Sequence, residues 1–240
     1  MNTSKPLYHR HRFSAEIINH CVWLYIRFAL SYRDVEEMMA ARGVGLSYET
    51  VRYWAQKFGG IYAKRLRAGP ARPGDHWHLD EVYLSFHGKQ QYLWRAVDQD
   101  GEVLDILVQP RCNRQAARKF FRKLLKGQRY APRVIVTDKL GSYAAANAEV
   151  LPDVAHLSDK RANNRAENSQ QPTRERECRM HGFKSAGHAQ RFLATFGGVS
   201  SFFRSGRHLL RAVNYREIMC RRYAEWSQVV ESGLGLQRSG

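Results

Sequence analysis

Three acidic residues stand where a carboxylate is costly unless the protein uses it. Asp80 lies inside the apolar segment W-H-L-D-E-V-Y, and Asp138 ends the apolar segment R-V-I-V-T-D. An unpaired carboxylate among buried apolar residues is destabilising, so such acids are usually kept for a metal ion or for catalysis. Glu167 is a third candidate, because it follows Asn163 and Asn164, which can cap a helix. If the two apolar segments are neighbouring strands, Asp80 and Asp138 converge at one edge of a sheet.

Carboxylate oxygens of this kind suit Mg²⁺, and two ions roughly 3.5–4 Å apart support phosphoryl transfer. We therefore predict that Asp80, Asp138 and Glu167 hold Mg²⁺, as two ions, with Mn²⁺ as a possible substitute. Glu81 is expected to point to the opposite face of its strand and is therefore a weaker candidate for the same role. Lys139 is a candidate for orienting phosphates, with a solvated surface position as the alternative. Each acid alone also has a structural explanation, but the ordered set of three favours a metal site.

The charge of the chain favours a polyanionic partner. Its 240 residues include 39 Lys and Arg against 22 Asp and Glu, which gives a formal net charge of +17. The excess of basic over acidic residues is 6 in residues 1–70, 3 in 71–160 and 8 in 161–240. Basic flanks around a nearly balanced centre suit an enzyme that acts on nucleic acid. The alternative is a basic surface that only keeps the protein soluble.

Composition excludes several other classes. Apolar residues make up 43% of the chain, which is enough for a buried core and excludes global disorder. No apolar run approaches the roughly 20 residues that cross a bilayer, so we expect neither a membrane span nor a secretory signal. The four cysteines lie far apart, as is typical of a reducing compartment. These features predict a cytoplasmic protein.

Three helices are predicted in the N-terminal quarter of the chain. Apolar residues recur at helical spacing over residues 14–29, and Ser31 with Asp34 predicts a capping box that opens a second helix, ended by Gly43. Ser47 then caps a third helix. This pattern is typical of a helix-turn-helix, with an ordinary three-helix bundle as the alternative. The candidates for DNA contact on the third helix are Tyr48, Arg52, Tyr53, Gln56 and Lys57.

The sequence period changes from helix to strand after a Pro- and Gly-rich segment. The later order of elements is β-β-β-α-β-α-β, which predicts an α/β fold with three antiparallel strands followed by parallel ones. Their predicted ranges are strands at 76–86, 90–98 and 102–110, a helix at 113–126, a strand at 133–138, a helix at 142–149 and a strand at 154–157. The predicted domains are a helix-turn-helix domain at 1–67, a linker at 68–75, a catalytic core at 76–185 and a C-terminal helical basic region at 186–240.

These segments together resemble the bacterial insertion-sequence transposases of the DDE class, and more narrowly the insertion-sequence-six family. The resemblance spans about residues 13–220 and implies a ribonuclease-H-like mixed-sheet catalytic domain preceded by an all-α helix-turn-helix domain. It implies that Asp80, Asp138 and Glu167 are the catalytic, metal-binding triad and that Arg174 holds DNA from the helix of Glu167. The segments that carry it are S-Y-R-D-V-E-E-M-M-A-A-R-G-V (31–44), W-H-L-D-E-V-Y (77–83), Y-L-W-R-A-V-D (92–98), V-T-D-K (136–139), N-N-R-A-E (163–167) and G-F-K-S (182–185).

The activity implied by this resemblance is DNA transposition. The helix-turn-helix would bind the terminal inverted repeats of an insertion sequence, and the triad would catalyse metal-dependent strand cleavage and strand transfer of the cointegrate type. The implied partners are double-stranded DNA, at the element ends and the target, and further copies of the chain in a homodimer or higher oligomer, at the bacterial nucleoid and without a membrane. The alternatives are a non-catalytic DNA-binding regulator, an inactive relic and a nuclease on the same fold. A regulator leaves the strand-borne acids without a purpose.

Overall fold

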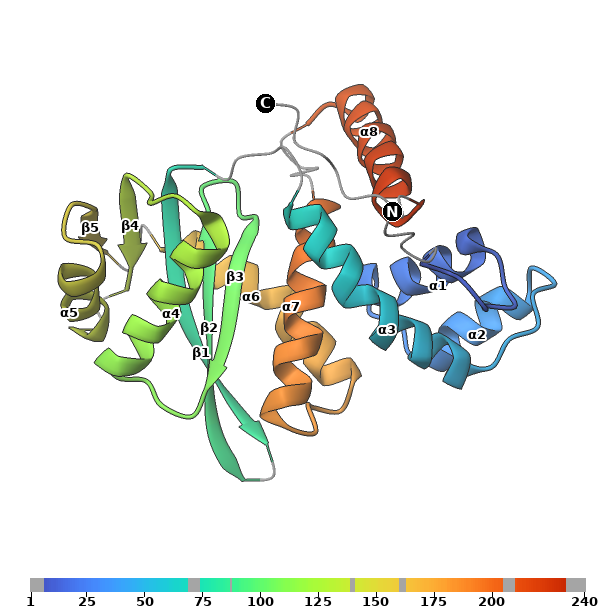
Figure 1. The fold of residues 1–240 in the computed structure, drawn as a ribbon, viewed down its shortest axis with the longest axis horizontal. Coiled ribbons are helices and arrows are strands. Elements are labelled where there is room, and N and C mark those ends of the chain that lie inside the picture. Colours follow the sequence, from blue (N-terminus) through green and yellow to red (C-terminus); the bar gives the residue numbers. More distant parts are fainter. Residues whose placement is uncertain are drawn as a thin grey trace, which may run out of the picture. The chain divides into compact units, whose positions relative to one another are not determined.

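The computed structural model describes residues 7–68, 74–86, 88–138, 141–159, 163–204 and 210–231, and the chain divides into two compact units (Figure 1). The helical unit comprises the described residues of 1–70 and 198–240, and the sheet unit comprises those of 71–197. Helix α7 (Ala186–Phe202) contributes to both. The functional domain boundaries inferred from the sequence stay predictions, and residues 69–73 of the expected linker lie outside the described residues.

The first three helices of the helical unit begin where their capping residues indicate. Helix α1 (Ala15–Arg27) starts after Ser14, and α2 (Tyr32–Ala40) starts at a reciprocal capping box. In that box Asp34 N donates to Ser31 Oγ at 3.1 Å and Ser31 N donates to Asp34 Oδ2 at 2.8 Å. Helix α3 (Tyr48–Arg67) follows the predicted cap at Ser47. Gly43, at φ +75°, adopts the left-handed conformation that suits a glycine after a helix end.

The apolar face of α3 forms much of the core of this unit. Val51, Trp54, Phe58 and Tyr62 are buried, as their spacing predicts. The C-terminal helix α8 (Ala212–Glu231) completes the same core, because Trp226 packs edge-on against Tyr62 with ring centroids 5.3 Å apart. No helix in the described ranges is long and apolar enough to cross a membrane.

The sheet unit contains a five-stranded mixed sheet with the strand order β3-β2-β1-β4-β5. The antiparallel pairs β1–β2 and β2–β3 come from consecutive hairpins, whereas the pairs β1–β4 and β4–β5 are parallel and need helical crossovers. This arrangement confirms the predicted mixed α/β sheet. Its elements are β1 (His76–Phe86), β2 (Lys89–Asp98), β3 (Val103–Gln109), α4 (Arg114–Gln128), β4 (Val134–Thr137), α5 (Gly141–Val150), β5 (Ala155–Ser158) and α6 (Asn164–Arg179).

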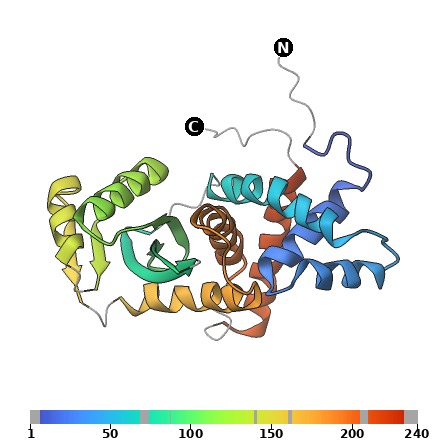
Figure 2. The ribbon, with the colours of Figure 1, turned by 90° about the horizontal axis from the view of Figure 1, so that it is seen from below.

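Helices cover both faces of the sheet (Figure 2). On one face, Trp77 and Leu79 of β1 pack with Phe120 of α4 and Tyr143 of α5 in a fully buried cluster. On the other face, Leu93 of β2 packs with α7. Helix α6 also lies on this second face, where its residues bond to the sheet. The alternation of side chains along β1 therefore directs Trp77 and Leu79 into one layer and His78 and Asp80 toward the other.

Helix α6 is continuous through Pro172. A proline inside a helix removes one backbone hydrogen bond, which the sequence alone would read as a possible helix end. Because the helix continues, Glu167 and Arg174 lie on one helix, seven residues or about two turns apart, and so occupy the same face. The backbone of α6 thus supports the register that the family resemblance implies.

Candidate active site

Asp80 and Asp138 meet because their strands are parallel neighbours. The pairing sets His78 opposite Val136, and two residues further along both strands it brings Asp80 level with Asp138. Strand β4 ends at Thr137, so Asp138 lies at the carboxyl end of the strand. The Asp138 carbonyl accepts hydrogen bonds from Thr137 Oγ1 at 2.8 Å and Ser158 Oγ at 3.0 Å, which fixes the backbone at this point. The convergence of the two strand-borne acids expected from the sequence is present.

Glu81 lies close to both, although its place on the strand predicted a side chain on the opposite face. Oxygen atoms of Asp80, Glu81 and Asp138 all lie within 4.8 Å of one another, a spacing that suits a metal ion. Alternation directs neighbouring side chains to opposite faces where they leave the backbone, but the longer Glu81 side chain still brings a carboxylate oxygen near the other two. Strand β4 ends at Thr137, so the pairing of β1 with β4 does not extend to Glu81. The donor set is three hard oxygen ligands, which fits a divalent cation.

The electrostatics of Glu81 reflect this crowding. Burial, together with the negative charges of Asp138 and Asp80, raises the pKa of Glu81 to about 7 from its ordinary value of 4.5, while a hydrogen bond with Tyr143 opposes the shift. Burial also raises the pKa of Tyr143 well above its ordinary value, with the nearby Glu81 carboxylate as the next cause. Three acids that repel one another in a half-buried site are stabilised by a positive charge among them.

Helix α6 is held by hydrogen bonds to β1, which carries Asp80 and Glu81, and to its neighbour β2. The side-chain amide of Asn163, just before the helix, donates to the Leu79 carbonyl at 2.8 Å. The buried guanidinium of Arg95 on β2 donates to the Ser169 carbonyl and to Thr173 Oγ1. Glu167 lies on α6 between these two attachments, although its side chain is outside the described part of the structure. Its position on the backbone is therefore fixed relative to β1.

A cleft of about 1140 Å³ runs between β1 and α6. From β1 it is lined by Asp80, Glu81 and Tyr83, and from α6 by residues that recur every three or four positions, as one helix face does. Glu167 precedes the first two of these by three and four residues and so begins the same row. The lining residues of α6 are Gln170, Gln171, Arg174, Glu177 and Cys178. Acids and a cation thus face one concave surface.

The structure places the sequence-predicted residues at two locations. Asp80, Asp138 and Arg174 belong to the sheet unit, as does the backbone of Glu167, whereas the α3 candidates belong to the helical unit. On α3, Arg52, Tyr53, Gln56 and Lys57 are exposed, with Tyr53 at 52%, and Tyr48 is half-buried with Arg33 over its ring at 4.6 Å. Lys139 lies outside the described residues. The roles of all these residues in metal and DNA binding stay predictions.

Sequence reasoning missed the rest of the cleft lining. Gln170 and Gln171 lie one turn beyond Glu167, a spacing that would have placed them on its face once the helix was known to continue. Tyr83 lines the cleft and is exposed, and it gave no comparable signal, because a tyrosine on a strand is common. Glu81 was visible in the sequence but was set apart by the alternation rule.

Sheet order and acid position together define the class of the molecule. Acids at the centre of a sheet ordered 3-2-1-4-5, beside a helix bearing a third acid, are the arrangement of a ribonuclease-H-like nucleic-acid enzyme. Comparison with known families agrees: residues 74–206 match a family described as a DDE domain.

Proteins similar to this chain in sequence are named as transposases. A Staphylococcus aureus protein named transposase for insertion sequence element IS257 in transposon Tn4003 is 32% identical over 181 residues, covering 73% of this chain and 80% of the relative. A transposase for insertion sequence-like element IS431mec, from S. aureus strain Mu50, is 31% identical with the same coverage. A chain in the structure of a simian T-cell lymphotropic virus intasome with PP2A regulatory subunit B56 gamma matches 58% of this chain and 53% of its own length at 14% identity and a TM-score of 0.34, which is too loose to add to the argument.

The chain belongs to the DDE-class insertion-sequence transposases, in the insertion-sequence-six family. This confirms the resemblance stated from the sequence, the ribonuclease-H-like fold and the function of a DNA transposase. The acidic cluster of the sheet unit suits the divalent metal ions that this family uses.

Proposed function

We propose that this chain binds the terminal inverted repeats of its insertion sequence through α3 and cleaves and joins DNA at the cleft of the sheet unit, with Mg²⁺ as the metal. Mn²⁺ is the alternative ion, and two ions are expected. The observation that carries the proposal is the convergence of Asp80, Glu81 and Asp138 within 4.8 Å, at a cleft shared with α6. A regulator that used only the helical unit would have no use for this cluster.

Asp80, Asp138 and Glu167 are the residues that would hold the metal, with Glu81 as a further ligand or as an acid that adjusts their charge. A divalent ion bound there supplies Lewis-acid activation of the attacking oxygen and stabilisation of the leaving oxygen. Arg174 lines the same cleft and would hold the DNA backbone beside the acids. The role of Lys139 in orienting phosphates is part of the same proposal.

The proposed chemistry has two phosphoryl-transfer steps. Water attacks the phosphodiester at the element end, the bond to the 3′-oxygen breaks, and a 3′-hydroxyl and a 5′-phosphate result. The freed 3′-hydroxyl then attacks a phosphodiester of the target, forming one P–O bond while the target's own 3′-oxygen leaves. No protein nucleophile is consumed. The protein's part is to position the two DNA strands and to place carboxylates where charge develops.

Cointegrate-type transposition, a homodimer or higher oligomer, and action at the bacterial nucleoid in the cytoplasm complete the proposal. Two element ends must be cut and joined in one event, which favours at least two copies of the active site. The basic surplus of the chain, +17 overall, supports a standing association with DNA.

The test is strand transfer of a labelled oligonucleotide duplex carrying the element end into plasmid DNA with Mg²⁺. The unmodified chain is expected to give joined product, and Asp138→Asn is expected to bind the same duplex equally well but to give none. Asp153→Asn, an exposed acid in a turn of the sheet unit, is the matched control and should retain activity. End binding without joining by the unmodified chain would favour the regulator or relic, and cleavage without joining would favour a nuclease.

A further inference from the structure

The segment before α1 is held firmly against the helices of the helical unit. The Tyr8 hydroxyl donates to the Val230 carbonyl of α8 at 2.7 Å, and it also bonds with Asn19 of α1 and Tyr62 of α3. Five residues later, Phe13 packs edge-on against Trp54 of α3, with ring centroids 5.3 Å apart. The four residues between these anchors are therefore fixed over α3.

The backbone between Tyr8 and Phe13 contains one residue, Arg10, in a conformation that is unfavourable for a side chain. Arg10 adopts φ +62°, in the left-handed region, where a residue with a side chain pays a cost that glycine does not. The turn is closed by His11 N, which donates to the Tyr8 carbonyl at 3.1 Å. Backbone strain in a well-anchored segment tends to cluster at binding sites, because the surrounding contacts must maintain it.

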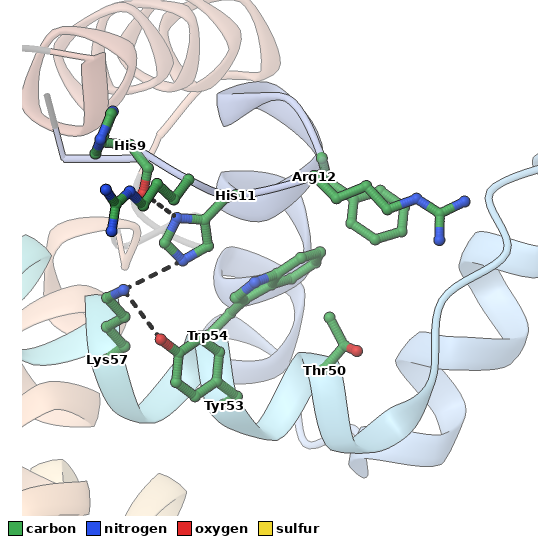
Figure 3. Close-up of a pocket in the computed structure, with 9 residues that line it drawn as sticks. His9, His11, Arg12, Thr50, Tyr53, Trp54 and Lys57 are labelled. Atoms are coloured by element: carbon green, nitrogen blue, oxygen red, sulfur yellow. Dashed lines mark hydrogen bonds between the residues drawn. The ribbon is translucent and has the colours of Figure 1, made fainter.

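A pocket of about 550 Å³ lies between this segment and α3 (Figure 3). No acidic residue lines it, and neither Arg10 nor Arg12 forms an ion pair with any residue in the described ranges. A concave site with several cations and no anion is an anion site by composition. The lining residues are His9, Arg10, His11, Arg12, Phe13, Thr50, Tyr53, Trp54 and Lys57.

His11 and Lys57 are linked by hydrogen bonds within the pocket. His11 Nδ1 lies 3.1 Å from the His9 carbonyl, so that nitrogen carries the proton, and His11 Nε2 then accepts from Lys57 Nζ at 3.3 Å. Lys57 Nζ also donates to the Tyr53 hydroxyl at 3.0 Å. Figure 3 shows Lys57 joined to both rings. Neither His11 nor Tyr53 is a carboxylate. These two hydrogen bonds therefore position the Lys57 ammonium without cancelling its charge.

Of the expected DNA-contact residues of α3, Tyr53 and Lys57 line the pocket, whereas Arg52 and Gln56 lie on a neighbouring side of the helix. Thr50, Tyr53, Trp54 and Lys57 recur as one helical stripe, and each of Arg52 and Gln56 precedes a member of that stripe by one residue, which is about 100° around the helix. When a recognition helix enters a DNA groove with one side, its neighbouring side lies against the sugar–phosphate backbone. Contacts made there position the protein on the DNA and do not read the base sequence.

We propose that the pocket formed by His9, Arg10, Arg12 and Lys57 binds a backbone phosphate of the DNA end that α3 engages, and that it anchors the protein without contributing to sequence choice. This inference rests on the proposed function of α3. The ligand class is a DNA phosphodiester, recognised by guanidinium, imidazole and ammonium donors.

The experiment measures binding of the full chain to two fluorescent duplexes, one with the terminal inverted repeat and one with the same bases scrambled, over a series of salt concentrations. Arg10→Gly is the informative variant, because glycine keeps the left-handed backbone and removes only the cation. We expect it to weaken binding to both duplexes by the same factor and to reduce the slope of log K against log salt by about 0.9, the value for one phosphate. Arg10→Lys should recover most of the loss.

Two controls separate this result from others. Lys64→Ala removes an exposed cation of α3 that does not line the pocket, and it should change the slope less than Arg10→Gly does. Gln56→Ala should change the ratio between the two duplexes. Unchanged affinity and slope in Arg10→Gly would overturn the inference, as would a loss confined to the inverted-repeat duplex. If the unmodified chain does not distinguish the two duplexes, end recognition by α3 fails, while the salt slope on the scrambled duplex still decides the phosphate pocket.

Discussion

Asn163 and Leu79 are joined by a hydrogen bond of 2.8 Å from the side-chain amide to the strand carbonyl. Asn163 stands at the N-cap position of α6, yet its side chain makes no capping bond, contrary to what its place before the helix suggests. The buried amide is used instead to attach the start of α6 to the residue that precedes Asp80. The third acid of the expected triad is therefore positioned through a contact between a helix start and a strand.

Asn163→Ala tests this attachment. Removing the amide leaves the buried Leu79 carbonyl without that donor, which costs about 1–3 kcal/mol for an unsatisfied buried acceptor. We expect a modest loss of stability and a larger loss of strand transfer, with DNA-end binding by the helical unit unchanged. Equilibrium urea unfolding, duplex binding and strand transfer measured side by side would check it. Asn163→Asp is the companion variant: it has a similar shape but cannot donate when ionised, and it adds a buried carboxylate, so it should lose at least as much stability and activity as alanine. Full activity in both variants would contradict the positioning role.

The attachment of α6 at Arg95 leads to a prediction about stability. Arg95 is 2% exposed and donates to Ser169 and Thr173 of α6. Arg95→Met removes both bonds and leaves two buried acceptors of α6 without this donor, so it is expected to destabilise the sheet unit by about 1–3 kcal/mol for each acceptor. Thr173→Val removes one acceptor and keeps the shape, so its expected cost is smaller, at about 1–3 kcal/mol. Thermal and urea unfolding should rank the variants in this order, and a neutral Arg95→Met would show that α6 does not depend on this contact.

Much of this fold was predictable because its local signals agree with one another. Capping residues such as Ser31 with Asp34 marked helix starts, and the change from helical spacing to alternation marked the strands. Asp80 and Asp138 were predictable as a pair because parallel neighbours that carry acids at the same level must bring them together. These inferences need only the nearest residues in the chain or in the sheet.

What could not be predicted depends on where other elements end or pack. Glu81 was set apart from the site because alternation describes only the direction in which a side chain leaves the backbone, and does not show where a long carboxylate ends. The continuity of α6 through Pro172 depends on contacts with the sheet, as at Arg95. That α8 packs against α3 through Trp226 is likewise a long-range contact that no local pattern indicates.

Glu81 should make the stability of the protein depend on pH in the absence of metal. Its folded pKa, about 7, is raised above the ordinary 4.5, so between these values the folded state holds more protons than the unfolded state. Stability therefore falls as pH rises through that interval and is lowest above it. Glu81→Gln is expected to raise the free energy of unfolding by about 2–3 kcal/mol at pH 8 and by much less at pH 4.

Urea unfolding at both pH values, in chelator, measures this gain, with the exposed Asp153→Asn as a control that should show no such difference. Adding Mg²⁺ at pH 8 is expected to stabilise the unmodified chain by neutralising the same repulsion. An equal gain at both pH values would mean that packing, and not charge, accounts for the effect of Glu81→Gln.

Arg174 offers the last test, because it is exposed in the cleft and lies two turns from Glu167. Arg174→Ala removes no buried contact, so stability should change by less than about 0.5 kcal/mol. Strand transfer should fall about ten- to hundredfold if the guanidinium holds a phosphate through charge-assisted hydrogen bonds. Arg179→Ala, an exposed arginine of the same helix that does not line the cleft, is the matched control and should lose little activity. Equal losses in both variants would indicate a general effect of positive charge. A specific phosphate contact in the cleft predicts a loss only for Arg174, because Arg179 does not line the cleft.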